Sequence, residues 1–365
     1  MRKISIPALG LVFSFAQADQ LEYTTYRFKD DGQNEVFTSA FNVAKTLWEK
    51  SVLLLDVEVD RITVPASDAV SGASRPLRNA NRDFVKNRGQ GIVGLEQKLG
   101  DNSTLTASYY NSREVDYYSQ AVIGSWTQEL AQKNFTFQLR GQYTRDDVGE
   151  ILLSGDLTES FKESHEAHLT ITQLLSSTSV FRTGGDATRL KGLLSDPYRL
   201  VPKIDANGDT TNPKENHPSQ RWRLAGWVEL SQYLPIEASM VMNYRYYFDD
   251  WGVNSHTGQF KLNKYLGPNW IASPEYRYYF QTQADFGDYA KNASPGTYFT
   301  GDYKLRTFDS NNFGFGLTYF FRGLVAGHNA YQFMEGASLS IMFFRYWNSL
   351  DFSANIFESK IKFGF

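Results

Sequence analysis

Most of the chain alternates between apolar and polar positions with a period of two, as β-strands with two unlike faces do. Residues 236–248 show the pattern most clearly. One face holds Ile236, Ala238, Met240, Met242, Tyr244, Tyr246 and Phe248, and the other holds Glu237, Ser239, Asn243 and Arg245. Residues 135–143 and 312–321 repeat the split. The sequence therefore predicts an all-β protein.

Tracing this alternation along the chain predicts about sixteen strands. They are expected near residues 21–29, 34–46, 49–64, 89–98, 102–112, 115–128, 133–146, 161–175, 177–185, 219–233, 235–249, 252–265, 269–283, 309–321, 336–348 and 351–365. The segment 34–46 is the weakest of these, because its pattern also fits a helix.

The predicted connections differ systematically in length. The longest, 65–88, 146–160, 186–218 and 284–308, all follow odd-numbered strands. Most connections after even-numbered strands are tight turns, such as Gly100-Asp101-Asn102 and Leu266-Gly267-Pro268, where Gly and Pro supply the required backbone angles. Outer-membrane barrels have this asymmetry between long external loops and short periplasmic turns. The connection from Arg322 to Glu335 is an exception, because it is long for a periplasmic turn.

The apolar faces point to lipid. Several continue for eleven or more residues, comparable with the roughly 9–11 residues of a tilted membrane-spanning strand, whereas soluble strands average nearer 5–6. Aromatic residues gather at strand ends, as in 244–251 and 276–280, where interfacial girdles lie. A soluble sheet with aromatic cross-strand pairs explains one such cluster but not the set. We expect a closed, antiparallel transmembrane β-barrel in a bacterial outer membrane, with the lipid bilayer as its surroundings.

The two ends of the chain carry export signals. Residues 1–18 have the form of a cleavable signal peptide, with Arg2 and Lys3 before an apolar stretch and Ala16-Gln17-Ala18 at the cleavage site. Residues 19–365 are expected to form one barrel domain. The last strand places Ile361, Phe363 and Phe365 on one face, and a terminal aromatic strand of this kind resembles the signal that the outer-membrane assembly machinery binds.

Composition excludes several classes of protein. There are 22 Tyr and 27 Phe but mean hydropathy is −0.43, so aromatic rings are mixed with polar residues. The net charge of −3 lacks the basic excess of a nucleic-acid binder. The absence of cysteine excludes disulfides, thiolate metal sites and lipoprotein anchoring.

Candidate sites for catalysis and metal binding are weak. His165 and His168 are three residues apart on a predicted strand, so they lie on opposite faces and cannot act together. No motif places a nucleophile beside either, and neither an enzyme nor a cofactor is expected. The oxygen ligands of Asp205, Asn207 and Asp209 alternate as calcium ligands do, but the loop departs from an EF-hand and a plain polar turn explains it better.

The inward face is the best functional candidate. Its predicted charged residues are Asp56, Glu58, Asp60, Arg140, Arg221, Arg223, Glu229, Glu237, Arg245, Glu275 and Arg277. Rings of charge of this kind set ion selectivity in aqueous pores. A salt-bridge lattice that stiffens or plugs the barrel explains the same residues equally well.

Several stretches resemble a bacterial family of predicted outer-membrane barrels, domain of unknown function 3570. They are 30–32, 59–63, 71–74, 195–199, 245–252 with His256-Thr257, and 276–279 with 283–286. The resemblance implies the fold and location, and an expectation that relatives occur beside periplasmic lipoproteins and flavin-attachment or thioredoxin-like proteins.

Three hypotheses for function follow. The first is a pore or transporter for a small hydrophilic solute. The second is a non-conducting platform for a periplasmic or surface partner, such as a lipoprotein or an envelope redox protein. A lipid-modifying enzyme is the third and the least supported.

Overall fold

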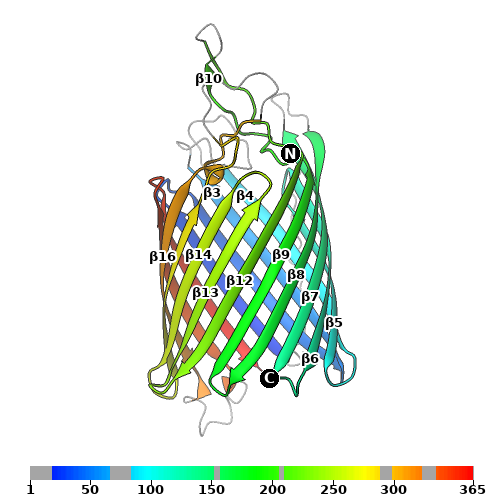
Figure 1. The fold of residues 1–365 in the computed structure, drawn as a ribbon, viewed down its shortest axis with the longest axis vertical. Helices are drawn as coiled ribbons and strands as arrows, with labels where there is room; N and C mark the ends of the chain where they lie inside the picture. Colours follow the sequence, from blue (N-terminus) through cyan, green and yellow to red (C-terminus); the bar gives the residue numbers. More distant parts are fainter. Residues whose placement is uncertain are drawn as a thin grey trace.

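Sixteen antiparallel strands close into a single barrel in the computed structural model, which describes residues 19–65, 84–151, 157–204, 209–287, 298–322 and 334–364 (Figure 1). The wall strands are β1 (Gln20–Asp30), β2 (Glu35–Trp48), β3 (Ser51–Val64), β4 (Phe84–Lys98), β5 (Ser103–Arg113), β6 (Tyr117–Leu130), β7 (Phe135–Ile151), β8 (Leu157–Ser176), β9 (Ser179–Gly192), β12 (Gln220–Leu234), β13 (Ala238–Asp249), β14 (Asn254–Tyr265), β15 (Trp270–Gln281), β16 (Phe308–Phe320), β17 (Ser338–Asn348) and β18 (Ser353–Gly364). The prediction of a closed barrel of about sixteen strands is confirmed, and residues 35–48 form a strand rather than a helix.

The first and last strands close the barrel. β1 pairs with β18 from Gln20 opposite Gly364 to Asp30 opposite Ala354. Within this seam, Ile361 lies opposite Tyr23 and Phe363 opposite Leu21. Phe365 and the predicted signal peptide lie outside the described residues. Closure satisfies the backbone donors and acceptors that an open sheet edge would leave unpaired in lipid.

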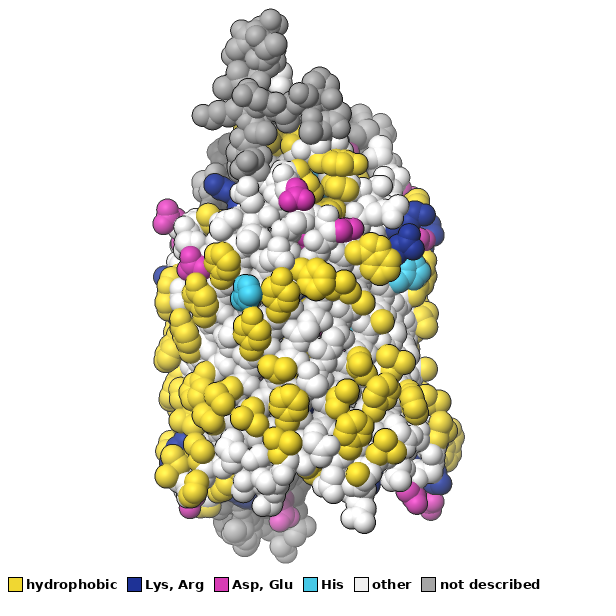
Figure 2. Space-filling model, in the orientation of Figure 1, with side chains coloured by type: hydrophobic (Ala, Val, Ile, Leu, Met, Phe, Trp, Pro, Cys, Tyr) yellow, Lys and Arg dark blue, Asp and Glu magenta, His cyan; other side chains and the backbone are white. Residues whose placement is uncertain are grey.

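The outer surface of the wall is apolar. On β13 the outward side chains are large and exposed, among them Met242, Tyr244, Tyr246 and Phe248. Figure 2 shows apolar side chains over the middle of the visible face, with charged side chains near the two ends. This arrangement matches a hydrocarbon layer bounded by polar interfaces. The predicted assignment of the ring-rich face to the outside is therefore confirmed.

The turns at the two ends differ as the sequence predicted. The turns β4–β5 and β14–β15 are tight, and Gly100 and Gly267 have φ values of +84° and +79° that favour glycine. Long connections lie at the opposite end, which is at the top of Figure 1. The exceptional connection after β16 falls largely outside the described residues.

Strands at the long-loop end extend further than the sequence pattern suggested. β7 and β8 pair as far as Ile151 and Leu157, β4 begins at Phe84, and β9 continues to Gly192. The predicted loops 65–88, 146–160 and 186–218 were therefore too long. These extensions are rich in Lys, Asp and Glu, because beyond the lipid layer neither face of a strand needs to be apolar.

Two small elements lie in the long loops. The connection between β9 and β12 contains a short hairpin of β10 (Lys203–Ile204) and β11 (Thr210–Thr211), and a 3-10 turn, η2 (Tyr303–Leu305), precedes β16. In the described part of the chain, no helix is long and apolar enough to cross a membrane.

Candidate functional site in the barrel lumen

Two adjoining cavities occupy the lumen toward the long-loop end. Their volumes are about 770 Å³ and about 700 Å³. Both are lined by Arg221, Arg223, Asp302, Lys304 and Leu305, so these five residues lie where the two cavities meet. The strand wall supplies the arginines, whereas the other three residues come from the loop before β16.

A folded cap lies above this space. We define the cap as the described residues of 193–219 and 298–307. Backbone hydrogen bonds join its two segments, because Asn216 and Phe299 each donate to the other's carbonyl oxygen. Arg199 adds ion pairs to Glu215 at 3.4 Å and to Asp302 at 3.1 Å. The two loops therefore behave as one unit.

Glu215 is the centre of the cap. Its side chain is fully buried and accepts hydrogen bonds from the backbone N–H of Asp196 at 2.7 Å and the hydroxyl of Thr300 at 3.1 Å. The Nε2 atom of His217 lies 3.5 Å from its carboxylate. Burial by itself would raise the pKa of Glu215, but the adjacent His217, the backbone N–H of Asp196 and the charge of Arg199 outweigh it and lower the pKa to about 2. Glu215 is therefore ionised at neutral pH and holds the cap together.

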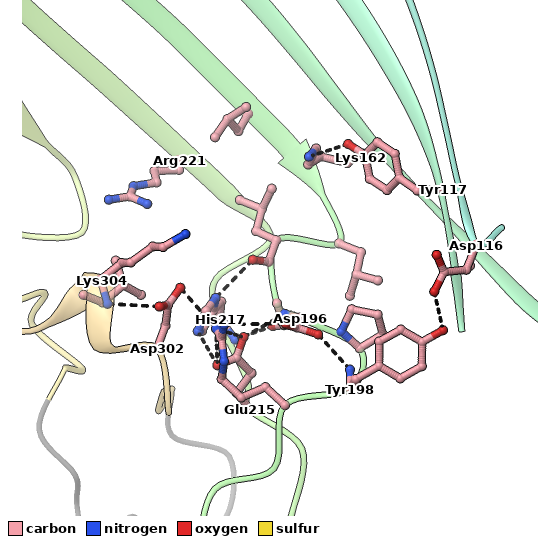
Figure 3. Close-up of a pocket in the computed structure, with 18 of the residues that line it drawn as sticks. Asp116, Tyr117, Lys162, Asp196, Tyr198, Glu215, His217, Arg221, Asp302 and Lys304 are labelled. Carbon is pink, nitrogen blue, oxygen red and sulfur yellow. Dashed lines mark hydrogen bonds and ion pairs between the residues drawn. The ribbon is translucent and has the colours of Figure 1, made fainter. Parts of the chain in front are cut away.

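The cap is also anchored to the barrel rim. Tyr198 donates a hydrogen bond to Asp116, between β5 and β6, at 2.8 Å. On another side, His217 packs on Trp251 and Phe286, with ring centroids 5.3 Å and 5.5 Å away. Figure 3 shows the Tyr198–Asp116 contact and the Asp302–Lys304 contact on either side of Glu215 and His217. The cap thus joins loops that leave the barrel at distant points of its circumference.

Three of the predicted acidic lumen residues, Asp56, Glu58 and Asp60, lie together on β3, and each has hydrogen-bond partners. We call β2–β4 the acidic wall. Asp60 is buried and accepts hydrogen bonds from Thr38 and Arg88, both at 2.5 Å. Glu58 accepts from Arg88 at 3.2 Å and Gln90 at 2.6 Å, and Asp56 accepts from Asn42 on β2. These carboxylates form a stiffening lattice within the sheet.

Four of the five predicted lumen arginines, Arg221, Arg223, Arg245 and Arg277, lie on β12, β13 and β15. We call these strands, together with β14, the basic wall. Arg221 is neutralised by Asp249, with Nε 3.0 Å from the carboxylate, and its guanidinium lies 4.2 Å from the centre of the Trp251 ring. Arg245 lies 3.6 Å from Asp186. Arg223 and Arg277 line the second cavity, and neither forms an ion pair with any residue that the structure describes.

The remaining predicted lumen residues have mixed positions. Glu229 pairs with Arg182 at 3.1 Å, and Glu275 pairs with Lys261 at 3.5 Å. Arg140 donates to Gln142 at 2.5 Å. Glu237 is not part of the wall: it is exposed in the turn before β13, with φ +54°. The alternating pattern predicts an inward side chain at Glu237 only if the strand continues through this residue, and here the turn interrupts it.

The other predicted sites contain no assembled chemistry. His165 packs on Tyr143 with ring centroids 5.0 Å apart, and His168 bonds Asp186 at 2.9 Å, so the two histidines do face opposite sides of β8. Within the described ranges no cluster of metal-binding side chains occurs. Asp205 and Asn207 of the calcium candidate lie outside these ranges, and Asp209 alone is inside them, so that site stays a prediction.

Sequence reasoning missed the cap and its residue Lys304. A signal was nevertheless present, because three of the stretches that carry the family resemblance meet there. Arg199 belongs to the stretch 195–199, Trp251 to 245–252 and Phe286 to 283–286. The rings of Trp251 and Phe286 pack with their centroids 5.1 Å apart. Gly252 has φ +86°, and a side chain there would collide with the Asp285 carboxylate.

Comparison with known proteins places the chain by fold. Residues 31–334 match the family described as "Protein of unknown function (DUF3570)". No curated protein matches the sequence significantly.

Solved structures that resemble this one are outer-membrane proteins. A bacterial polysaccharide outer membrane secretin matches with a TM-score of 0.54 at 9% identity, over 96% of this chain and 99% of its own. The siderophore receptor PirA from Pseudomonas aeruginosa has a TM-score of 0.47 at 11% identity, over 90% of this chain and 56% of the receptor, so this chain matches little more than half of that protein. OmpT of Vibrio cholerae lacking loop L8 has a TM-score of 0.48 at 10% identity, over 95% and 98%. At such identities the secretin match shows a shared fold alone.

Proposed function

The chain belongs to the DUF3570 family, and from the geometry of its lumen we propose that this outer-membrane barrel passes a small hydrophilic solute. The observation that carries the proposal is the pair of adjoining, polar-lined cavities beneath the cap. Charged and hydroxyl-bearing side chains from β8 to β15 line its second cavity, including His168, Thr188, Arg223, Thr257 and Arg277. A wall that served only to fill the barrel would be expected to bury these groups against each other.

Single-channel recording from the refolded protein in a planar bilayer tests this proposal. We expect discrete current steps in potassium chloride. Folding is checked independently by the heat-sensitive electrophoretic mobility of closed barrels. Folded protein that carries no current at any voltage would contradict a pore.

The cap should control the current. Replacing Glu215 with Gln (E215Q) removes the charge that Arg199 pairs with, so we expect longer or more frequent openings. Thr211, which is exposed on β11 of the same loop, provides a matched control as T211A. Its recordings should equal those of the wild type.

A second candidate function is a non-conducting platform for a partner in the periplasm or at the cell surface. The observation that favours it is the cap itself, because the hydrogen bonds and ion pairs of the buried Glu215 hold the loops in a folded surface over this end of the barrel. Because long loops face the cell exterior in outer-membrane barrels, the cap favours a partner at the cell surface. The periplasmic lipoprotein or redox protein that the family resemblance implies would instead contact the short-turn end. Copurification in mild detergent tests this function, and loss of the partner on cap substitution would place the contact at the loop end.

A further inference from the structure

The second cavity has more positive than negative charge that is free to act on a solute. Its basic residues are Arg221, Arg223, Arg245, Arg277 and Lys304, and its acidic residues are Asp186 and Asp302. Asp186 is engaged by Arg245 and His168, and Asp302 shares Arg199 with Asp196 and Glu215. Arg221 is neutralised by Asp249.

Three cations therefore remain. Within the part of the chain that the structure describes, Arg223, Arg277 and Lys304 have no ion-pair partner. Arg223 stands out further, since its Nε–H is buried and has no hydrogen-bond acceptor. A buried cationic donor without a partner is costly, and a bound anion is one of the ways in which such a donor is satisfied.

These groups form a patch that extends over four neighbouring strands of the wall, β12 to β15. Tyr247 on β13 lies opposite Ala225 of β12, one inward position from Arg223. Arg245 lies opposite Thr257 on β14, which in turn lies opposite Tyr279 on β15.

Arg277 is the next inward residue before Tyr279, and Lys304 enters from the cap above. Arg277 is level with Glu229 of β12 through Gln259 and Asn243, so Arg223 is three strands away from it and six residues further along the strand. Both arginines nevertheless line the second cavity, because the curved wall directs their side chains into the same lumen.

We propose that this patch binds a small multivalent anion whose charges are carboxylate or phosphate groups. Planar guanidinium groups match both kinds of oxyanion through paired N–H donors. An anion with two or more such groups engages Arg223 and Arg277 together, with Lys304 closing the site from the cap. The proposal deepens the proposed function by naming the class of solute.

Isothermal titration of the folded barrel in zwitterionic detergent at low ionic strength tests the proposal, with inorganic phosphate and citrate as separate probes. We expect saturable binding of at least one probe, weakened by added salt. The double variant R223Q/R277Q should bind that probe at least tenfold more weakly. R182Q is the matched control, because Arg182 is another lumen arginine but pairs with Glu229 and does not line the cavity. Its affinity should stay within twofold of the wild type.

The two probes separate the two chemistries, because binding of phosphate alone indicates a phosphorylated solute and binding of citrate alone a polycarboxylate. Absence of saturable binding to the wild type for both probes overturns the proposal. An equal loss of affinity in R182Q and R223Q/R277Q overturns it too, since the effect would then come from lumen charge in general. Titration does not depend on current, so an anion-binding barrel that fails to conduct would reject the pore and leave this site intact.

Discussion

The acidic wall and the basic wall face each other across the lumen, since β3 and β13 are opposite in the strand order of the barrel. Both walls carry three or more charged inward residues, yet they differ in how those charges are satisfied. On the acidic wall, Asp60 and Glu58 are held by Arg88 and amide or hydroxyl donors. On the basic wall, Arg223 and Arg277 have no ion pairs within the described part of the barrel. Charged lumen residues that lack ion-pair partners are therefore better candidates for a functional role than those that have them.

The largest expected effect is on ion selectivity. Reversing both unpaired arginines, as R223E/R277E, replaces the cationic side of the second cavity with an anionic one. Because pore charges favour ions of the opposite sign, we expect the ratio of anion to cation permeability to fall by about tenfold. Reversal potentials in a potassium chloride gradient measure this ratio. An unchanged ratio would show that the basic wall does not line the ion path.

The stability of the barrel should depend more on the acidic wall than on the basic wall. R88M leaves the buried Asp60 without its ion partner, and breaking a buried pair by removing one member costs about 3 kcal/mol or more. R223Q and R277Q remove cations that have no ion-pair partner in the described structure, so we expect them to lower the free energy of unfolding by less than about 1 kcal/mol. Urea unfolding in lipid vesicles gives both values. Equal losses on the two walls would remove the contrast between them.

The cap should respond to acid. Since the pKa of Glu215 is lowered from 4.5 to about 2, its stabilising effect is complete above pH 4.5 and is lost as the pH falls toward 2. A shift of this size corresponds to roughly 3 kcal/mol of cap stability. Amide hydrogen exchange of residues 209–219, corrected for the intrinsic pH dependence, should accelerate within that window.

E215Q provides the control for this effect. Its cap should exchange faster at neutral pH and lack the acid-dependent step. A wild-type cap that exchanges at the same corrected rate at pH 5 and pH 2.5 would contradict the role of Glu215.

The smallest expected effect comes from neutralising the acidic wall. D56N and E58Q keep the side-chain shapes, and their carboxylates are already engaged by Asn42, Arg88 and Gln90. We therefore expect less than about a twofold change in permeability ratio. A larger change in D56N or E58Q than in R223E/R277E would mean that the acidic wall determines the ion selectivity.

Much of the barrel follows from the sequence because lipid imposes a strict period of two on the spanning strands. Gly100 and Gly267 marked their turns for an equally local reason, since positive φ favours glycine. The parity argument failed at Glu237, where the turn interrupts the strand. It also failed for Lys86, Arg88 and the tips of β7 and β8, which lie in strand extensions with no apolar face.

The partnering of the lumen charges could not be read from the sequence. Asp60 and Arg88 are 28 residues apart, and Glu215 and Thr300 are 85 apart, so only the register and the loop fold bring them together. Alternation along a strand predicts only which charged side chains face inward. It does not distinguish the partnered set from the unpartnered one, and it omits Lys304, which comes from a loop with no alternation.

The reversal potential of the wild-type barrel, recorded across a tenfold gradient of potassium chloride, tests the contrast between the walls most directly. The unpaired arginines of the basic wall predict a potential of the sign that indicates preference for chloride, diminishing as the salt concentration on both sides is raised. A potential of the opposite sign, with potassium preferred, would contradict the account.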